Sequence, residues 1–366
     1  MFGLILISIV TIFHLYVFWR VGSVSFIKDR IPLKTLAAGG IILWSLFFLG
    51  RVYGHTGGGP IAAGLEFIGM TWMATLFLLF TTFLVADLFT GFGFFLRSRV
   101  PRIRGAALVA GLILALFGMI QGMRPPLVTD HQVALPGLPS ELAGLKMVVV
   151  SDLHLGSQLG GKWLSGIVGR VLKEKPDLIL LVGDIYEGHE RPSGEILSAM
   201  RKLNAPLGVW AVLGNHEFYG GPEVIDALID DSGLTVLRNS HVEIRPGLVL
   251  AGVESGGRHR LPENGAETLG QALPLNSPEP VILLSHKPWQ VEEAAALGAD
   301  LMISGHTHNG QIWPFGYLVK RMFPYLAGRY RVNGMTLLVG RGTGTWGPRM
   351  RLWLPGEILK VILVRE

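Results

Sequence analysis

Four long apolar runs near the start of the chain constrain its fold more than any other feature. They cover residues 3–19, 35–50, 67–86 and 105–123. Each is close to the ~17–25 apolar residues that a helix needs to cross a bilayer. Buried core helices are the alternative, but four such runs so close together leave too little polar surface for a soluble domain. We therefore predict a transmembrane region of four helices over residues 1–124.

The positive charge of the chain lies beside these apolar runs. The whole chain has 32 Lys and Arg, 27 Asp and Glu, and a net charge of +5. Residues 1–124 hold ten basic and three acidic residues, a net charge of +7, which leaves −2 for the remainder. Basic residues that flank membrane helices meet anionic lipid headgroups and follow the positive-inside bias. We therefore expect membrane lipids as partners, and no nucleic acid.

The distribution of basic residues between the loops predicts an orientation. Loops 20–34 and 97–104 hold four Lys or Arg each, whereas loop 51–60 holds only Arg51. The two basic loops are expected on the cytoplasmic side. With four spans, the C-terminal domain then lies on the extracytoplasmic side of the membrane. If the fourth run lies along the interface instead, the domain is cytoplasmic.

Three ionisable residues, His14, Glu66 and Asp87, fall within this apolar region. Ionisable groups inside a membrane often mark a function. Glu66 and Asp87 are near predicted helix ends, where the membrane interface solvates charge. We favour that simpler explanation for both carboxylates.

The rest of the chain has the pattern of an α/β domain. Residues 125–145 are rich in Pro and turn residues, and we interpret them as a linker and the first edge of a domain over 146–366. Strands are predicted from apolar runs at 146–151, 178–183, 208–213, 248–253, 281–285, 301–304, 335–339 and 358–364. Helices are predicted from amphipathic stretches at 161–174, 192–203, 222–231 and 289–297. This alternation favours sheets covered by helices on their outer faces, with ligands at the carboxyl ends of the strands.

Five short motifs lie at the ends of these predicted strands. They are Ser151-Asp152-Leu153-His154, Gly183-Asp184, Gly214-Asn215-His216, Ser285-His286 and Gly305-His306-Thr307-His308. Each motif alone is weak, because an Asp after a strand is often a helix cap. Their shared position argues against coincidence. The chain has no Cys, so the side chains offer a mixed nitrogen and oxygen donor set, which favours Mn, Fe, Zn, Ni or Co.

The spacing within the motifs suggests how metal ions are held. Asp152 and His154 are two residues apart at a strand end, and in an extended strand they share a face and can meet one cation. Asp184 follows the next strand. Two dications close together repel each other, so we expect the Asp184 carboxylate to bridge them.

The ordered set resembles the motifs of the calcineurin-like metallophosphoesterase superfamily, which are D-x-H, G-D, G-N-H, H and G-H-x-H. The stretches GHTHNGQIWPF at 305–315 and GTGTWGPRMRLWLPGEI at 342–358 resemble its membrane-anchored branch. This resemblance implies an α/β fold with a β-sandwich flanked by helices, and two divalent metal ions as cofactors. One metal ion would be held by Asp152, His154, Asp184 and His308. The other would be held by Asp184, Asn215, His286 and His306.

The resemblance also gives His216 a catalytic role without metal ligation. This side chain would face the scissile phosphate and would stabilise or protonate the leaving group. Glu217 stands where many family members have Asp, and we expect its longer side chain to orient the His216 ring. Glu187 either supports the ligand residues from behind or is a solvated acid, and we favour the solvated acid.

Together the motifs and the apolar runs predict a membrane-anchored dimetal phosphoesterase. It would hydrolyse a phosphomonoester or a phosphodiester by in-line attack of a metal-bridging hydroxide. A lipid-linked substrate suits an enzyme held at a membrane, and a UDP-2,3-diacylglucosamine-type lipid pyrophosphate is an alternative that requires a cytoplasmic site. An alternative of another class is a non-catalytic membrane transporter or sensor with a decayed phosphoesterase domain. The complete set of ligand residues argues against that alternative.

Other residues are candidates for contact with the substrate or the membrane. Arg258, Arg260, Lys287 and Arg341 are cations that can bind a phosphate. Residues 315–331 mix aromatic and basic side chains. They form either a flap that touches lipid headgroups or an ordinary amphipathic surface segment.

Overall fold

The computed structural model describes residues 2–54, 59–187, 191–254, 265–274 and 277–366. The chain divides into two compact units. The first unit contains Met1–Met123 together with Gly347–Trp353. The second unit contains Arg124–Trp346 and Leu354–Glu366.

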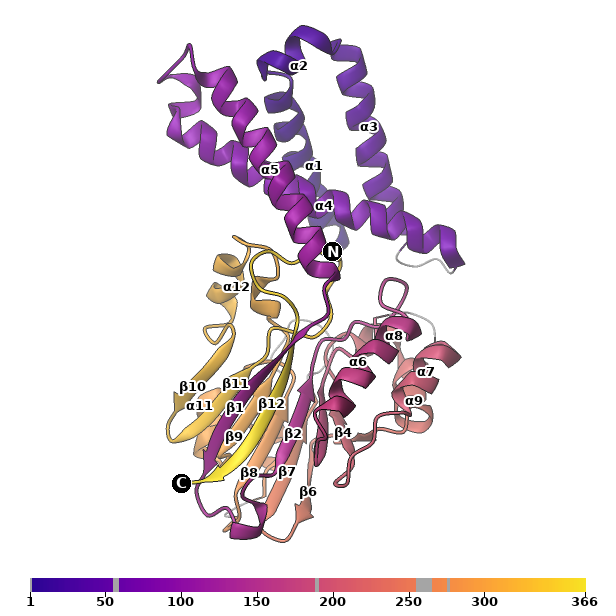
Figure 1. The fold of residues 1–366 in the computed structure, drawn as a ribbon, viewed down its shortest axis with the longest axis vertical. Coiled ribbons are helices and arrows are strands. Elements are labelled where there is room, and N and C mark those ends of the chain that lie inside the picture. Colours follow the sequence, from indigo (N-terminus) through magenta and orange to yellow (C-terminus); the bar gives the residue numbers. More distant parts are fainter. Residues whose placement is uncertain (1, 55–58, 188–190, 255–264, 275–276) are drawn as a thin grey trace. The chain divides into compact units, whose positions relative to one another are not determined.

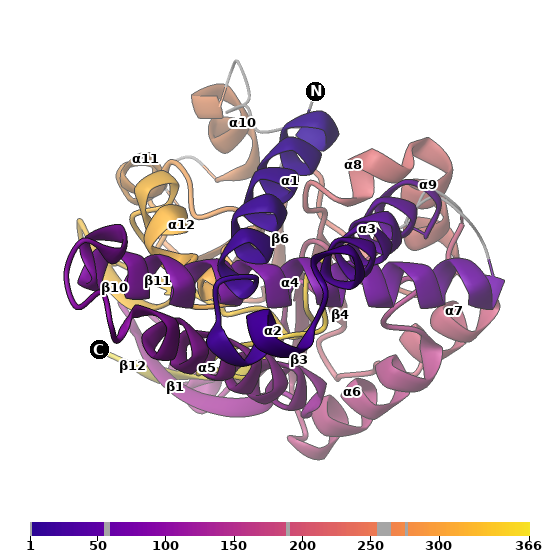
Figure 2. The same cartoon turned by 90° about the horizontal axis from the view of Figure 1, so that it is seen from above.

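Four long helices make up most of the first unit (Figure 1). They are α1 (Phe2–Val21), α3 (Leu33–Leu49), α4 (Gly59–Phe89) and α5 (Val100–Met123), with the short α2 (Ser25–Arg30) between α1 and α3. All four long helices are long and apolar enough to cross a membrane, so the four predicted apolar helices are present. The longest, α4, crosses the other three and contacts each of them (Figure 2).

Asp87 lies in a cluster of charged side chains inside this helix bundle. Its carboxylate is completely buried, accepts a hydrogen bond from Tyr16 Oη at 2.6 Å, and lies 2.5 Å from Arg20 Nε. Arg104 Nε and Nη2 donate to the other carboxylate oxygen at 3.2 and 3.0 Å. Glu66 is also buried, with 8% of its surface exposed. The expectation that solvent at the interface surrounds these two carboxylates is therefore wrong, because protein groups cover both, and ion pairs within the bundle compensate the charge of Asp87.

The segment Gly347–Trp353 packs on helix α5 within the first unit. Its Arg351 amide donates to the Gly118 carbonyl at 3.0 Å, and Gln121 Nε2 donates to the Trp353 carbonyl at 2.8 Å. A Cβ atom on Gly122 would lie 2.6 Å from the Arg349 carbonyl oxygen. The small residues of α5, spaced Gly-x-x-x-Gly, therefore allow the backbone of this segment to approach the helix closely.

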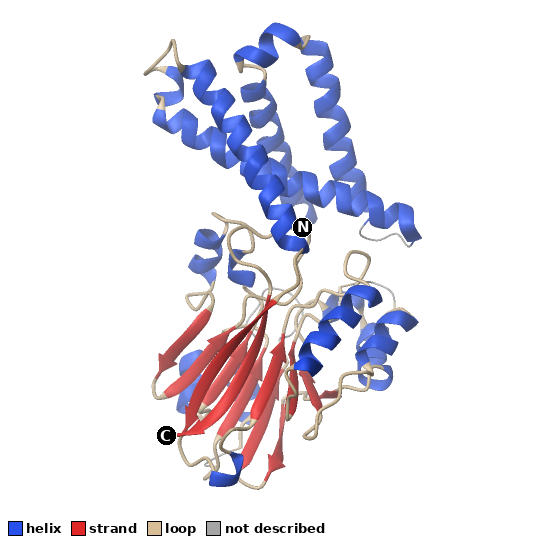
Figure 3. Cartoon of the chain, viewed as in Figure 1, coloured by secondary structure: helices blue, strands red, loops and turns tan. Residues whose placement is uncertain are grey.

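Two six-stranded sheets form the centre of the second unit (Figure 3). The first sheet has, in spatial order, β1 (Leu127–Leu135), β12 (Glu357–Arg365), β2 (Lys146–Val150), β3 (Leu178–Val182), β4 (Val209–Val212) and β5 (Thr235–Val236). The second has β10 (Gly328–Val332), β11 (Met335–Val339), β9 (Leu301–Ser304), β8 (Val281–Ser285), β7 (Leu248–Val253) and β6 (Ser240–Arg245). Strands β2 to β5 run parallel, as do β7, β8, β9 and β11. The motif residues follow the carboxyl ends of five of these parallel strands: β2, β3, β4, β8 and β9.

Helices cover the outer faces of both sheets. Those of the second unit are α6 (Gly161–Lys173), α7 (Gly194–Met200), α8 (Glu217–Gly220), α9 (Pro222–Asp231), α10 (Gly265–Ala272), α11 (Val291–Ala296) and α12 (Gly316–Met322). Side chains of α6, α7 and α9 share a core with the first sheet, and those of α10 and α11 share a core with the second. A third core, which includes Leu180 and Leu284, joins the inner faces of the sheets. This arrangement confirms the predicted sandwich of sheets flanked by helices.

The predicted strands that consist of continuous apolar runs match the structure closely. Four strands were not predicted: β1, β5, β6 and β10. Strand β1 pairs with β12, which is more than 200 residues away along the chain. The sequence around β1 is rich in Pro and turn residues, so it gave no local sign of a strand. Strand β6 is at the edge of its sheet and alternates between exposed and half-buried residues, so it has no apolar run.

Candidate metal centre

The five motifs meet at one edge of the sandwich, after strands β2, β3, β4, β8 and β9. Their side chains form three groups, in each of which the ligand atoms lie within 4.8 Å of one another. The groups are Asp152, His154 and His308; His154, Asp184 and His216; and Asp184, His286 and His306. The shared members link the three groups into one continuous site.

The backbone at this edge is left-handed at five of the predicted ligand residues. Asp152, His154, Asp184, His306 and His308 have φ angles between 45° and 70°. This conformation is unfavourable for residues other than Gly, by about 1–3 kcal/mol each, and it is concentrated at functional sites. The expectation that Asp152 and His154 share a face of an extended strand is therefore wrong. They converge because the chain turns after β2 and hydrogen-bonds to the Gly183 and Asp184 carbonyls, each at 3.0 Å.

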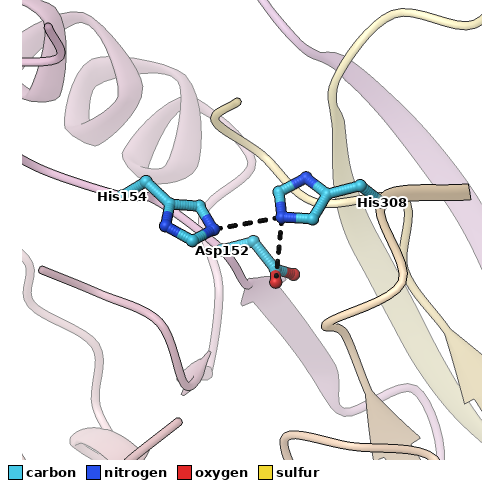
Figure 4. Close-up of side chains that lie close together, drawn as sticks. All are labelled: Asp152, His154 and His308. Atoms are coloured by element: carbon cyan, nitrogen blue, oxygen red, sulfur yellow. Dashed lines mark hydrogen bonds and ion pairs between the residues drawn. The ribbon is translucent and has the colours of Figure 1, made fainter. Parts of the chain in front are cut away.

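The first group contains two imidazole rings that face each other (Figure 4). His154 Nε2 lies 3.0 Å from His308 Nε2, and His308 Nε2 lies 3.4 Å from Asp152 Oδ1. The second oxygen of Asp152, together with the first, accepts from the His306 amide, which fixes the carboxylate. Three donor atoms that converge in this way form a set suited to a cation.

The third group is centred on His286, which is fully buried. Its Nδ1 lies 2.8 Å from the Val182 carbonyl oxygen, so Nδ1 donates and Nε2 faces the site. Nε2 lies 2.9 Å from Asp184 Oδ2 and 3.3 Å from His306 Nδ1. Asp184 Oδ2 is also 3.9 Å from His154 Nε2, so this carboxylate stands between the first and third groups.

Asn215 gives an independent test of whether the site fits a metal ion. Its side chain is 3% exposed, and its Oδ1 is buried without a hydrogen-bond partner among the described residues. A buried carbonyl oxygen without a partner costs free energy. The amide of the next residue, His216, donates to Asp184 Oδ1 at 2.9 Å, which brings this loop to the shared carboxylate. A bound cation would supply the partner that an oxygen of this kind lacks, so the residues present fit a metal ion.

The charges in the site shift the pKa of several groups. Burial lowers the pKa of His286, but the Asp184 carboxylate beside it outweighs burial and raises that pKa to about 9. Burial raises the pKa of Asp184, but the charges of His286 and His216 outweigh it and lower that pKa well below its ordinary value. Burial and the neighbouring His286 lower the pKa of His306 well below the usual range. The imidazole rings therefore keep the Asp184 carboxylate ionised.

His216 lies at the side of the site beside other rings. Its ring centroid is 4.7 Å from that of His154 and 6.2 Å from that of Trp346. Burial lowers the pKa of His216, and the carboxylates of Asp184 and Glu187 oppose that shift. His216 Nε2 also lies within the ligand-atom distance of Asp184 and His154, although the sequence predicts that it is not a ligand.

Glu187 and Glu217 have roles that differ from those expected. Glu187 Oε1 lies 3.5 Å from His216 Nδ1, and Oε2 lies 3.1 Å from His154 Nδ1. The expectation that Glu187 is a solvated acid is wrong, because its carboxylate holds two rings of the site. Glu217 is fully buried and accepts from the backbone amides of Asp184, Tyr186 and Gly214. It therefore ties the motif loops together instead of orienting the His216 ring, and burial beside Asp184 raises its pKa to about 7.

Residues 342–346 form part of the same site. The amides of Thr343 and Gly344 donate to the carbonyls of Ser151 and Asp152 at 2.8 and 2.9 Å. Trp346 exchanges two hydrogen bonds with the side chain of Gln311, just after the His308 motif. Sequence reasoning found this stretch only through its resemblance to related chains, because it contains no metal-ligand residue type.

The remaining candidates fall into four cases. Arg341 donates to Glu357 Oε1 at 2.8 Å, so its guanidinium already has an anionic partner. Arg258 and Arg260 lie outside the described residues. Residues 315–331 include α12 and β10, with Tyr317 and Met322 more than 60% exposed. Lys287 is buried beside the metal-ligand group and is considered below.

Comparisons with known proteins agree with the motif pattern. Residues 145–310 match the family model described as calcineurin-like phosphoesterase. A transmembrane protein with metallophosphoesterase domain from Danio rerio is 32% identical over 70% of this chain and 62% of its own length. The protein of the same name from Bos taurus is 32% identical over 73% of this chain and 64% of its own length. An uncharacterized metallophosphoesterase from Helicobacter pylori is 34% identical over 77% of this chain and 78% of its own length. The chain thus spans less than two thirds of the two vertebrate proteins.

Proposed function

This chain belongs to the calcineurin-like phosphoesterase family of metal-dependent phosphoester hydrolases, and from that premise we propose a membrane-anchored dimetal enzyme. It hydrolyses phosphomonoester or phosphodiester bonds at a membrane surface. The observation that carries this proposal is the convergence of Asp and His side chains from five strand ends on one site. The unpartnered Oδ1 of Asn215 supports it further.

Each metal ion has a donor set in the proposed enzyme. Asp152, His154, Asp184 and His308 hold one ion. Asp184, Asn215, His286 and His306 hold the other, so Asp184 is the shared ligand. The position of Asp184 Oδ2, 2.9 Å from His286 Nε2 and 3.9 Å from His154 Nε2, supports this assignment. Bound metal ions activate a water molecule and stabilise the charge that develops on the phosphoryl oxygens.

The side chains around the metal ligands orient the site and protonate the leaving group. His216 presents Nε2 to the leaving-group oxygen and stabilises or protonates it. Glu187 supports this role, because its carboxylate lies beside His216 Nδ1 and fixes the ring. Glu217 keeps the backbones of the Asp184 and Asn215 loops in register through three amide hydrogen bonds.

The four apolar helices anchor the enzyme in a membrane. Their basic loops favour a catalytic unit on the extracytoplasmic side. Anchoring restricts the enzyme to substrates at that surface, and a lipid-linked phosphate ester is the substrate that benefits most. A C-terminal reporter fusion that is active only in the cytoplasm checks the orientation. Activity of that reporter would reverse the proposed side and favour the lipid pyrophosphate substrate.

The proposed activity is tested with the full-length protein in detergent micelles. Hydrolysis of p-nitrophenyl phosphate and of bis-p-nitrophenyl phosphate is measured with Mn²⁺, with a chelator, and after Mn²⁺ is restored. We expect turnover that the chelator abolishes and Mn²⁺ restores, and that the Asp184→Ala variant lacks. A folded protein that binds no metal ion would sink the proposal.

A further inference from the structure

Lys287 is a buried cation whose ammonium has no hydrogen-bond partner among the described residues. It follows His286 directly at the carboxyl end of β8, and only 3% of its surface is exposed. Burial of an ammonium group is unfavourable unless an anion or several acceptors compensate it. The position of Lys287 therefore calls for an anionic partner.

The aromatic neighbour of Lys287 compensates its burial only in part. Lys287 Nζ lies 4.6 Å from the centre of the Trp289 ring, a cation–π contact. Such a contact is weaker than the desolvation of a buried ammonium. Trp289 is itself stacked on Phe323, with ring centroids 5.5 Å apart and an interplanar angle of 10°. The aromatic pair therefore shapes the wall beside the ammonium but supplies no anion.

This wall is next to the third group of metal-ligand residues, Asp184, His286 and His306. The Phe323 ring lies 4.9 Å from the His306 ring. The Lys287 ammonium is close enough to Asp184 and His306 for its charge to act on both. Asp184 already has His286 Nε2 at 2.9 Å, and metal ions bound there would add positive charge. Asp184 is the only carboxylate of the described residues whose charge acts on Lys287, so a further anion at this place is expected from a ligand.

We propose that Lys287 binds a phosphate oxygen of the substrate, and that it makes the site prefer phosphomonoesters over phosphodiesters. A phosphomonoester dianion carries more negative charge than a diester monoanion, so a fixed cation attracts it more strongly. The ammonium also forms charge-assisted hydrogen bonds to phosphate oxygens. This assignment rests on the proposed phosphoesterase activity and adds the class of ester to it.

The test compares two uncharged variants with a matched control in the full-length protein. Lys287→Met keeps the length of the apolar stem, and Lys287→Gln keeps a polar end. Lys320→Met removes a lysine charge from α12, which lies outside the metal-ligand motifs, and serves as the control. Four quantities are measured: the Kd of inorganic phosphate for the Mn²⁺-loaded protein by calorimetry, KM and kcat for both p-nitrophenyl esters, the bound Mn²⁺, and Tm.

Both Lys287 variants are expected to weaken phosphate binding and to raise KM for p-nitrophenyl phosphate, each by about tenfold or more. The KM for bis-p-nitrophenyl phosphate is expected to change less than that of the monoester, and bound Mn²⁺ and Tm stay at the level of the control. A phosphate Kd equal to that of the control would overturn the assignment. So would a loss of bound Mn²⁺ in both variants, because Lys287 would then support the metal ligands. Equal effects on both esters would overturn the preference for monoesters.

The experiment separates this inference from the proposed function. If the Mn²⁺-loaded wild type hydrolyses neither ester, the proposed activity fails, while the phosphate Kd still decides whether Lys287 binds phosphate. If the wild type hydrolyses the esters and the Lys287 variants match it, only the role of Lys287 fails. A wild type that binds no phosphate overturns the role of Lys287 directly.

Discussion

The helix bundle and the metal centre both bury charge, but they compensate it differently. In the bundle, Asp87 has two guanidinium groups and a tyrosine hydroxyl around one carboxylate. In the metal centre, Asp152 and Asp184 are equally buried, yet Asn215 Oδ1 and Lys287 Nζ remain without hydrogen-bond partners among the described residues. The counter-charges of the first arrangement are groups of the protein itself, and they hold helices together. On the proposals above, the second arrangement is complete only with metal ions and an anionic ligand, which is the difference between a structural and a functional charge cluster.

The largest expected effect comes from neutralising a carboxylate in the metal centre. Asp152→Asn keeps an oxygen that can accept from the His306 amide but removes a charged metal ligand. Metal ions contribute several kcal/mol to transition-state stabilisation, so kcat/KM is expected to fall by about a thousandfold. Bound metal is expected to fall by one ion per chain, with Tm of the chelator-treated protein unchanged or raised. Wild-type turnover in this variant would remove Asp152 from the ligand set.

The same substitution in the bundle is expected to act on stability instead. Asp87→Asn leaves Arg20 and Arg104 buried without their shared carboxylate. Breaking a buried ion pair in this way costs about 3 kcal/mol. We expect a lower Tm in detergent micelles, while Mn²⁺ binding at temperatures below unfolding is retained. If Asp87→Asn leaves Tm unchanged but abolishes turnover, the charge cluster of the bundle is functional. The contrast between a structural cluster and a functional cluster would then be wrong.

Packing of the segment 347–353 on α5 is expected to contribute less than this charge cluster. In Gly122→Ala the new methyl group meets the Arg349 carbonyl and Met350 Cα at 2.6 and 2.7 Å. Such overpacking costs about 2 kcal/mol. Gly64→Ala on α4 is the control, because a Cβ there has no neighbour within 4 Å. Thermal unfolding compares the two, and equal Tm values would show that the segment does not depend on close approach to α5.

The smallest expected effect for a single step is the pH dependence of metal binding, about 1.4 kcal/mol per pH unit. The pKa of His286 is raised to about 9, so below that pH the ring carries a proton that it must release to bind a metal ion. Affinity is therefore expected to rise about tenfold per pH unit between about pH 7 and pH 9, and to level off above. Calorimetry in buffers of different ionisation enthalpy measures the released proton. Affinity that is constant over this range would show that His286 is neutral before the metal ion binds.

Burial and the distance between paired strands decide which strands the sequence could predict. Strands such as Leu248–Val253 and Val281–Ser285 are buried on both faces, so their apolar runs mark their limits. Edge strand β6 and the distant pairing of β1 with β12 have no such local signal. In the metal centre, the motif residues converge as the sequence suggested. Their left-handed backbones and the contacts of Glu187 depend on hydrogen bonds between separate loops, and no single motif contains that information.

Gly347–Trp353 belongs to the unit of the four apolar helices, although it lies far along the chain from them. The two units therefore cannot be separated by one cut in the chain. A cut after α5 does not release an intact catalytic module, because seven residues of the other unit remain within the excised piece. Those seven residues continue directly from Trp346, whose backbone is hydrogen-bonded beside the metal-ligand motifs. An exchange of membrane anchors between related proteins would therefore succeed only if this internal stretch were exchanged with the helices. Anchor and catalytic unit are expected to evolve as one inherited whole, with compensating changes on α5 and in the stretch that packs on it.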